Sequence, residues 1–286
     1  MYSGIITSRH NALIKHARAV RDGRESQDQI FIEGLRLSEE ALRSRLVIQD
    51  VLYTEKFQHE ERGARLLYEL KAEGSRLSLL SEEVLAFVSD TRTPQGIVLL
   101  ASRPHEGRDA LLAGSAARSS KPVEAGQSTG AGLPLIVIIH GINNPANAGA
   151  ILRTAEAAGA QGAISTVGTT DLFSPKALRG AMGSSFRLRL WTGADFAEVL
   201  SWCRQRGIRT IGSSLAATHD HTETDWKIPV ALVVGSEAAG LTESEISMLD
   251  EAIRIPMRPP VESLNAAVAS GIILYEAARQ RRMGAG

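Results

Sequence analysis

The sequence contains a single cysteine, Cys203, and few aromatic residues. One cysteine excludes an intrachain disulfide and a zinc site built from cysteines. No stretch approaches the roughly 18 consecutive apolar residues that a membrane helix requires. The first twenty residues lack a continuous apolar core followed by a small-residue cleavage site, so we expect no signal peptide. These absences predict a cytoplasmic protein that uses neither a membrane nor a metal.

Two common nucleotide-binding fingerprints are also missing. Neither GxGxxG, the glycine pattern of dinucleotide-binding domains, nor a Walker A loop occurs in the sequence. A Rossmann dehydrogenase, which also needs an acidic residue about twenty positions after the glycines, therefore has no support.

The formal net charge is zero, but the basic residues are unevenly distributed. Near the N-terminus, Arg9, Lys15 and Arg18 lie within a segment where basic residues outnumber acidic ones. Two further basic groups are Lys176, Arg179, Arg187 and Arg189, and Arg279, Arg281 and Arg282. Such groups can hold a phosphate backbone even on a neutral molecule. Scattered solvated charges explain the same composition equally well.

A segment rich in Gly, Ala and Ser divides the chain. Residues 106–132 contain no aromatic residue and no sustained apolar period, which is typical of a flexible linker. This linker separates residues 1–105 from residues 133–286, and each part is long enough to fold alone. The first part alternates helical and strand patterns, which predicts a small α/β domain.

The second part predicts a parallel sheet. Its apolar runs "LPLIVIIHGI", "GAISTV", "RTIGSSL" and "VALVVGSE" are rich in β-branched residues and lack alternation, as strands buried on both faces do. Helical patterns separate these runs, so we expect helices on both sides of the sheet. A long helix over residues 262–282 ends the chain. Its spacing places one apolar set on one face: Leu264, Val268, Gly271, Ile272 and Tyr275.

Ligands bind beyond the carboxyl ends of strands in parallel sheets, and three stretches of unusual composition follow predicted strands. The first stretch, "NNPANAGAILRTAEAAGA" (residues 143–160), offers amide groups and one arginine, Arg153, inside an alanine-rich helix. Arg153 falls on the same helix face as Gly149. The alternative is structural: Asn-Pro caps the helix, and Arg153 pairs with Glu156 or Glu223.

The second stretch, "VVGSEAAGL" (residues 233–241), leaves a buried strand through two glycines and could hold a ligand through its backbone. Alone it is a weak signal, because Gly-Ser-Glu is common at strand ends. The third stretch, "IRIPMRPPVESLNAAVASG" (residues 253–271), begins with a short strand. A cap on the last helix is the structural alternative to a site role for Ser263, whereas Asn265 inside that helix has no capping need.

In this order and spacing, the three stretches strongly resemble the three motifs of the SpoU/TrmH family of RNA 2′-O-ribose methyltransferases, within the SPOUT superfamily. The linking segment "FSPKALRGAMGSSFRL" resembles the family's segment between the first two motifs. The first part of the chain, through "ITSRHNALIKHARAVRDGR" and "FIEGLRLSEEAL", is similar to the N-terminal domain of many members, which resembles the ribosomal L30e/L7Ae proteins and binds RNA.

The resemblance implies an α/β domain with a deep trefoil knot, a homodimer formed through that domain, and S-adenosyl-L-methionine as cofactor. It places Gly235, Ile255, Met257 and Leu264 around the cofactor. Knots are otherwise nearly absent from proteins, so the knot is a highly specific prediction about the fold.

The resemblance also implies the catalytic residues, which are Arg153, Asn147, Glu237, Ser263 and Asn265. Arg153 matches the arginine that acts on the ribose 2′-hydroxyl. A guanidinium scarcely deprotonates in proteins, so stabilisation of the developing alkoxide is the easier role for it than general base. Asn147 is expected to position Arg153, and Glu237 to anchor Arg153 or Asn147.

The expected function is 2′-O-methylation of structured RNA, with 23S rRNA preferred because of the L30e-like domain. Two alternatives remain: a tRNA 2′-O-methyltransferase, and a non-catalytic RNA-binding or ribosome-assembly factor on the same fold. Intact motif residues disfavour the latter. The residues expected to bind RNA are Arg9, Lys15, Arg18 and Arg179.

Overall fold

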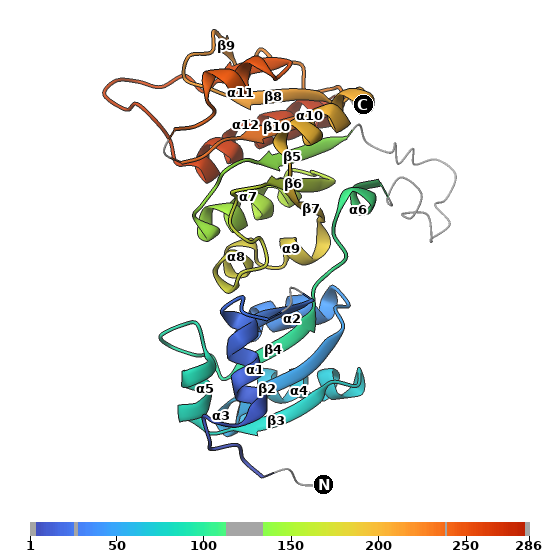
Figure 1. The fold of residues 1–286 in the computed structure, drawn as a ribbon, viewed down its shortest axis with the longest axis vertical. Coiled ribbons are helices and arrows are strands. Elements are labelled where there is room, and N and C mark those ends of the chain that lie inside the picture. The colour runs from blue at the N-terminus through green and yellow to red at the C-terminus, as the bar shows by residue number, and fades with distance from the viewer. Residues whose placement is uncertain (1–3, 26–27, 113–133, 238, 284–286) are drawn as a thin grey trace. The chain divides into compact units, whose positions relative to one another are not determined.

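The computed structural model describes residues 4–25, 28–112, 134–237 and 239–283 (Figure 1). The chain forms two compact units. Unit 1 comprises Met1–Pro104 together with Phe173–Arg187, and unit 2 comprises His105–Leu172 together with Leu188–Gly286. Each unit therefore takes its residues from two separate segments of the chain.

Unit 1 contains a four-stranded mixed sheet in the order β1-β4-β2-β3. Strands β1 and β2 both pair antiparallel with the central β4, and β2 pairs parallel with β3. The elements of its first segment are α1 (Ala12–Arg21), β1 (Gln29–Glu33), α2 (Leu35–Arg43), β2 (Ile48–Thr54), α3 (Glu55–His59), α4 (Glu61–Ala72), β3 (Arg76–Leu80), α5 (Glu82–Val88) and β4 (Ile97–Ser102). The small α/β architecture expected for this part of the chain is present.

The second segment of unit 1 contributes α8 (Pro175–Ala181) and α9 (Ser184–Arg187), and α8 packs against β1. Two ion pairs join this segment to the first: Arg179 to Asp90, and Arg187 to Glu40, each with nitrogen and oxygen 2.6 Å apart. Unit 1 is thus completed by residues that follow it by about seventy positions in the sequence.

Unit 2 is built on a seven-stranded sheet in the order β7-β6-β5-β10-β8-β11-β9, and every neighbouring pair is parallel. Its strands are β5 (Leu135–Ile139), β6 (Gly162–Thr166), β7 (Arg189–Ala194), β8 (Arg209–Ser213), β9 (His219–Asp220), β10 (Val230–Val234) and β11 (Glu251–Arg254). Its helices are α6 (Arg108–Leu112), α7 (Pro145–Ala157), α10 (Phe196–Gln205), α11 (Glu243–Ser247) and α12 (Ala266–Met283). The parallel α/β sheet predicted from the sequence is confirmed.

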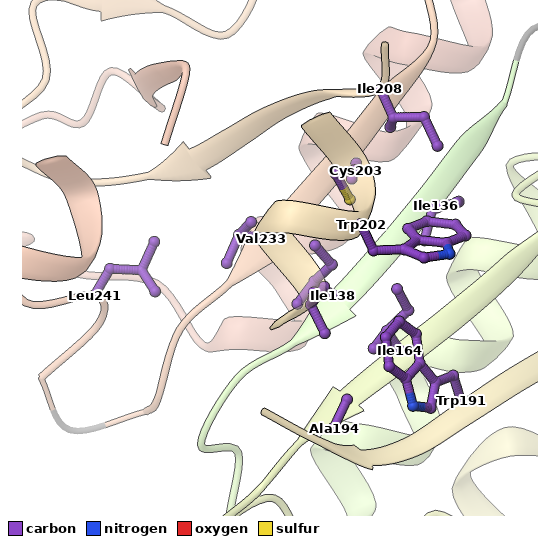
Figure 2. Packing of buried hydrophobic residues seen from close by; sticks show 12 residues of the cluster. Ile136, Ile138, Ile164, Trp191, Ala194, Trp202, Cys203, Ile208, Val233 and Leu241 are labelled. Carbon is purple, nitrogen blue, oxygen red and sulfur yellow. The ribbon is translucent and has the colours of Figure 1, made fainter. Parts of the chain in front are cut away.

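The strands at the centre of this sheet are covered on both faces. Ile136 and Ile138 of β5 pack with Trp202 and Cys203 of α10 in one core cluster (Figure 2). Val137, which points to the opposite face, is also fully buried. Burial on both faces explains why β5, β6 and β10 read as continuous apolar runs.

Burial raises the pKa of the Cys203 thiol to about 12, so this side chain acts as a small apolar group in the core. The cluster also includes Leu241, at the end of the second stretch. The loop after β10 is therefore anchored in the core of unit 2.

Several elements differ from the prediction. Of the predicted linker, residues 106–112 are described and include α6, which packs against β7; residues 113–132 lie outside the described residues. Helix α12 begins at Ala266, four residues later than expected. Strand β11 ends at Arg254, ahead of Pro256, which has no N–H to donate to a neighbouring strand. None of the described helices is both long and apolar enough to cross a membrane.

Candidate active site

The chain leaves β5 through a hydrogen-bonded turn. Gly141 has a φ of 65°, a left-handed conformation that glycine adopts without strain. The Gly141 N–H donates to Thr169 Oγ1 at 3.0 Å, and the Thr169 hydroxyl donates to the Ile139 carbonyl at 3.0 Å. The Asn144 side chain then caps α7, with Pro145 at its first position. The first stretch is thus fixed before its helix begins.

Glu237, on the loop after β10, joins the second stretch to the first. Its carboxylate accepts hydrogen bonds from the N–H groups of Asn143 (3.3 Å) and Asn144 (3.2 Å) and from Asn147 Nδ2 (3.1 Å). Burial by itself would raise the pKa of Glu237, but these donors lower it below its ordinary value. Glu237 therefore stays ionised and organises the start of α7.

Asn265 joins the third stretch to the same network. Its Nδ2 donates to Asn147 Oδ1 at 3.2 Å, while its Oδ1 accepts the N–H groups of Ala267 (2.9 Å) and Val268 (3.3 Å) at the start of α12. Asn265 is therefore the cap of this helix, so the expectation that Asn265 has no capping need is wrong, and the structural alternative of a Ser263 cap is not formed. Three stretches that lie far apart in the sequence meet at Asn147.

Arg153 is exposed on α7 and forms no hydrogen bond or ion pair with the part of the chain that the structure describes. The structural alternative, a pair with Glu156 or Glu223, is therefore not formed. Thr154, its neighbour, lies against α12, where its Cγ2 would be 3.6 Å from a Cβ at Gly271. The guanidinium is therefore accessible to bind a group from outside the described residues.

The described residues of the loop between β10 and α11, 235–237 and 239–242, close tightly on one another. The Gly240 N–H donates to the Ser236 carbonyl at 3.0 Å. A Cβ at Gly235 would lie 2.5 Å from the Gly240 carbonyl carbon and 2.7 Å from the Leu241 nitrogen, so only glycine fits there. The loop, called the β10–α11 loop below, presents its backbone at the carboxyl edge of the sheet.

The segment between β11 and α12 offers apolar side chains and unused backbone groups. Ile255 and Met257 are half-buried, and Leu264 is 36% exposed. Neither Met257 nor Leu264 uses its backbone N–H or carbonyl in a hydrogen bond with another described residue. Apolar surface beside free backbone donors and acceptors is the chemistry of a small-molecule site.

The residues expected to bind RNA belong to unit 1. Arg18 and Arg9 lie over the ring of Phe87, with guanidinium carbons 4.1 and 5.1 Å from its centroid, and Lys15 is exposed. The charge of Arg179 is instead engaged by Asp90, as described above. Stacking of arginine on Phe87 leaves the α1 side of unit 1 basic and partly aromatic.

The third basic group is used inside unit 2. Arg279 forms a two-nitrogen contact with Glu276, at 2.7 and 2.8 Å. Arg281 donates to the carbonyls of Trp226, Ile228 and Pro134, at 2.8, 2.7 and 3.1 Å. Arg281 therefore ties α12 to other segments of unit 2, whereas Arg279 is paired within α12 itself.

Sequence reasoning missed one group at the carboxyl edge of the sheet: His140, whose two ring nitrogens are hydrogen-bonded to Thr166 and to Glu245. A histidine directly after a buried strand was the available signal. No group of His, Cys, Asp and Glu side chains among the described residues is arranged to hold a metal ion.

A parallel sheet with a hydrogen-bonded polar network at its carboxyl edge is a common arrangement of ligand sites in α/β proteins, and the comparison with known proteins identifies the family. Residues 134–275 match the model of the SpoU rRNA methylase family, and residues 11–99 match that of the MRM3-like substrate binding domain. The chain belongs to the SpoU rRNA methylase family. The family, the fold class and the methyltransferase class predicted from the sequence are confirmed.

The similarity extends over almost the whole chain. The 23S rRNA (guanosine-2′-O-)-methyltransferase RlmB of Ralstonia nicotianae is 32% identical over 234 residues, which cover 81% of this chain and 88% of RlmB. The 23S rRNA (guanosine(2553)-2′-O)-methyltransferase RlmP of Bacillus subtilis is 27% identical, covering 94% and 97% of the two chains. The structure of an AdoMet-bound rRNA methyltransferase from Sinorhizobium meliloti matches with a TM-score of 0.78 at 28% identity, covering 96% and 97%.

Proposed function

We propose that the protein transfers the methyl group of S-adenosyl-L-methionine to a ribose 2′-hydroxyl of 23S rRNA. The single observation that carries this proposal is the Asn147 network, because it brings all three stretches together at the start of α7, the helix that also carries the unpaired Arg153 side chain. The names of the relatives, RlmB and RlmP, support rRNA over tRNA as substrate.

The cofactor fits the residues at the carboxyl edge of the sheet. The backbone of the β10–α11 loop at Gly235, together with Ile255, Met257 and Leu264, would hold it through free backbone groups and apolar side chains. When bound, S-adenosylmethionine supplies an electrophilic methyl group on a sulfonium. The trefoil knot that the resemblance implies stays a prediction.

Arg153 acts on the nucleophile. The 2′-oxygen gains negative charge as its hydroxyl proton passes to water, and the permanently charged guanidinium stabilises that charge until the oxygen forms its bond to the methyl carbon and the electron pair of the broken carbon–sulfur bond stays on sulfur. Alignment of the oxygen with the methyl group contributes several kcal/mol more. Asn147, Glu237 and Asn265 position the start of α7, and with it Arg153. Ser263, exposed on the third stretch, is assigned to the same pocket.

Unit 1 binds the RNA. Arg9, Lys15 and Arg18 are the proposed contacts to phosphate, since phosphate contacts by arginine and lysine supply the bulk of non-specific RNA affinity. Arg179 is the weaker candidate, because Asp90 neutralises it. With rRNA as substrate, we place the protein in the cytoplasm.

We also propose a homodimer through α12. Of the apolar face predicted from the sequence, four side chains are exposed, Leu264 by 36%, Val268 by 52%, Ile272 by 38% and Tyr275 by 52%, whereas Gly271 is half-buried beside Thr154 of α7. A contiguous apolar strip on a packed helix marks an interaction surface. A second copy of unit 2 is the proposed occupant, and the active site would be completed across this interface.

The proposal is tested by mapping 2′-O-methyl groups in rRNA and tRNA from cells with and without the gene. Loss of one methyl group from 23S rRNA, restored by the wild-type gene but not by the Arg153→Ala variant, is the expected result. Loss from tRNA alone would identify the tRNA alternative. Unchanged methylation, with no binding of S-adenosylmethionine by the pure protein, would leave the non-catalytic RNA-binding factor.

A further inference from the structure

His140 lies directly after β5, and three elements surround its imidazole. Its Nε2 is 2.9 Å from Glu245 Oε1 on α11, and its Nδ1 is 2.9 Å from Thr166 Oγ1 at the end of β6. The ring also stacks on Phe196 of α10, with centroids 4.2 Å apart. The side chain is only 17% exposed, so these contacts fix its orientation.

Both ring nitrogens are satisfied by one neutral tautomer. With the proton on Nε2, the imidazole donates to the Glu245 carboxylate and accepts the Thr166 hydroxyl proton at Nδ1. Thr166 is buried, and Phe196 packs against the core cluster of unit 2. Contacts with β6 and α10 therefore fix the position of the His140 ring, and its hydrogen bond to Glu245 in turn orients that carboxylate.

Glu245 in turn holds the end of the β10–α11 loop at Thr242. Its second oxygen, Oε2, accepts the Thr242 N–H at 2.7 Å, and the Thr242 hydroxyl accepts the Glu245 N–H at 3.3 Å, a complete capping box. Burial would raise the pKa of Glu245, but the bonds from Thr242 and His140 lower it, so the carboxylate stays charged. The loop ends where this cap begins.

The β10–α11 loop is thus held at both ends by residues of the β5 exit. At one end, Glu237 accepts the N–H groups of Asn143 and Asn144; at the other, Glu245 is bound by His140. None of the hydrogen bonds of His140 reaches Asn147 or Arg153. The second anchor therefore has no direct bond to Asn147 or Arg153, and the first anchor at Glu237 stays in place without it.

We infer that His140 is a positioning residue for the cofactor, acting through Glu245 on the backbone of the β10–α11 loop. This inference rests on the proposed function, in which that loop holds S-adenosylmethionine. Loss of the His140–Glu245 bond loosens the loop and weakens cofactor affinity. It leaves the transfer step intact once the cofactor is bound, because Arg153 and Asn147 are untouched.

The test compares His140→Ala, Glu245→Ala and the double variant with the wild-type full-length protein. Calorimetry with S-adenosylmethionine should show an affinity about 10-fold lower in each single variant, since a hydrogen bond to a charged group is lost. The double variant should be no weaker than either single one, because the two act through one bond. Single-turnover transfer at saturating cofactor should stay within about twofold of wild type.

Amide hydrogen exchange without cofactor supplies a readout independent of activity. Residues 239–245 should exchange faster in His140→Ala than in wild type, and His59→Ala, at an exposed position in unit 1, is the control that should change nothing. If His140→Ala does not fold, Thr166→Val removes only the hydroxyl that orients the ring and should shift affinity in the same direction.

Unchanged affinity together with unchanged exchange would overturn the inference, and so would a loss of transfer at saturating cofactor. A wild-type protein that binds S-adenosylmethionine but methylates no RNA would refute the proposed function and leave this test valid. If the wild type binds no cofactor, the exchange comparison alone decides whether His140 holds the loop.

Discussion

Two arginines on neighbouring helices of unit 2 are used in opposite ways. Arg281 on α12 donates to three backbone carbonyls, and burial lowers its pKa. Arg153 on α7 is exposed and has no hydrogen-bond partner among the described residues. The Arg281 guanidinium stabilises the fold, whereas the Arg153 guanidinium remains available to contact a substrate. Under the proposed function, the difference teaches that an isolated charge in an apolar helix is a better signal of a reactive residue than the C-terminal cluster of charges.

The largest expected effect is on Arg153. Replacement by alanine should lower single-turnover methyl transfer by about 10²- to 10³-fold, because the charge that stabilises the 2′-oxygen is lost. The thermal unfolding midpoint should hardly move, since no contact is removed. Arg153→Lys, which keeps the charge, should recover part of the rate. A drop of several degrees in the midpoint of Arg153→Ala would make this arginine structural, like Arg281.

The reverse pattern is expected for Arg281. Arg281→Ala should lower the free energy of unfolding by about 3 kcal/mol, because buried carbonyls lose a charged donor. Chemical denaturation measures this loss, and transfer well below the unfolding midpoint should stay near wild type. Arg282→Ala is the matched control, because Arg282 is exposed and its side chain donates to a single carbonyl, that of Ala278. A catalytic defect in a stable Arg281→Ala variant would contradict the contrast.

The two faces of α12 extend the comparison. Ile273 and Leu274 are buried, whereas Ile272 and Tyr275 are exposed. Ile272→Asp should weaken the proposed dimer at least about 10-fold, because a charge is then desolvated in an apolar contact. Analytical ultracentrifugation measures the dissociation constant. Tyr68→Asp on unit 1, at a side chain 76% exposed, should leave it unchanged. Equal masses for wild type and Ile272→Asp at all concentrations would refute the α12 dimer.

The smallest effect concerns the ionisation of Glu237. Its folded-state pKa is lowered, so the stability it contributes is present above the ordinary carboxyl pKa and is lost as pH falls through the lower folded value. The difference in unfolding midpoint between wild type and Glu237→Gln should therefore shrink as the pH drops from 7 to below 4. A difference independent of pH would show that the hydrogen bonds to Glu237 do not depend on its charge.

The sheet of unit 2 could be predicted because its signals are local. Strands β5, β6 and β10 are buried on both faces. The continuous apolar composition of each strand indicates this burial by itself, without information from the rest of the chain. The edge strand β7 was not found, because its mixed burial resembles a loop pattern. The local pattern of a segment indicates whether its residues are buried, but it does not indicate which other elements cover them.

The site was predictable in its members but not in its bonds. Asn147, Glu237 and Asn265 were recognised through the family resemblance, whereas the cap role of Asn265 appears only once α12 is seen to begin at Ala266. The anchor at His140 depends on a bond to a residue 105 positions away, which no local pattern encodes. The residue types at the edge of the sheet could be predicted from the sequence, whereas their hydrogen-bond partners depend on the fold of the whole unit.

The two-segment assembly of unit 1 bears on how such proteins can be recombined. A gene fragment ending at Pro104 would encode the four-stranded sheet without α8 and α9. Asp90 and Glu40 would then lose the guanidinium groups of Arg179 and Arg187, and the surface of β1 that α8 covers would face water. Fusion or exchange of unit 1 by a single cut is therefore disfavoured. Both segments of unit 1 would have to be moved together.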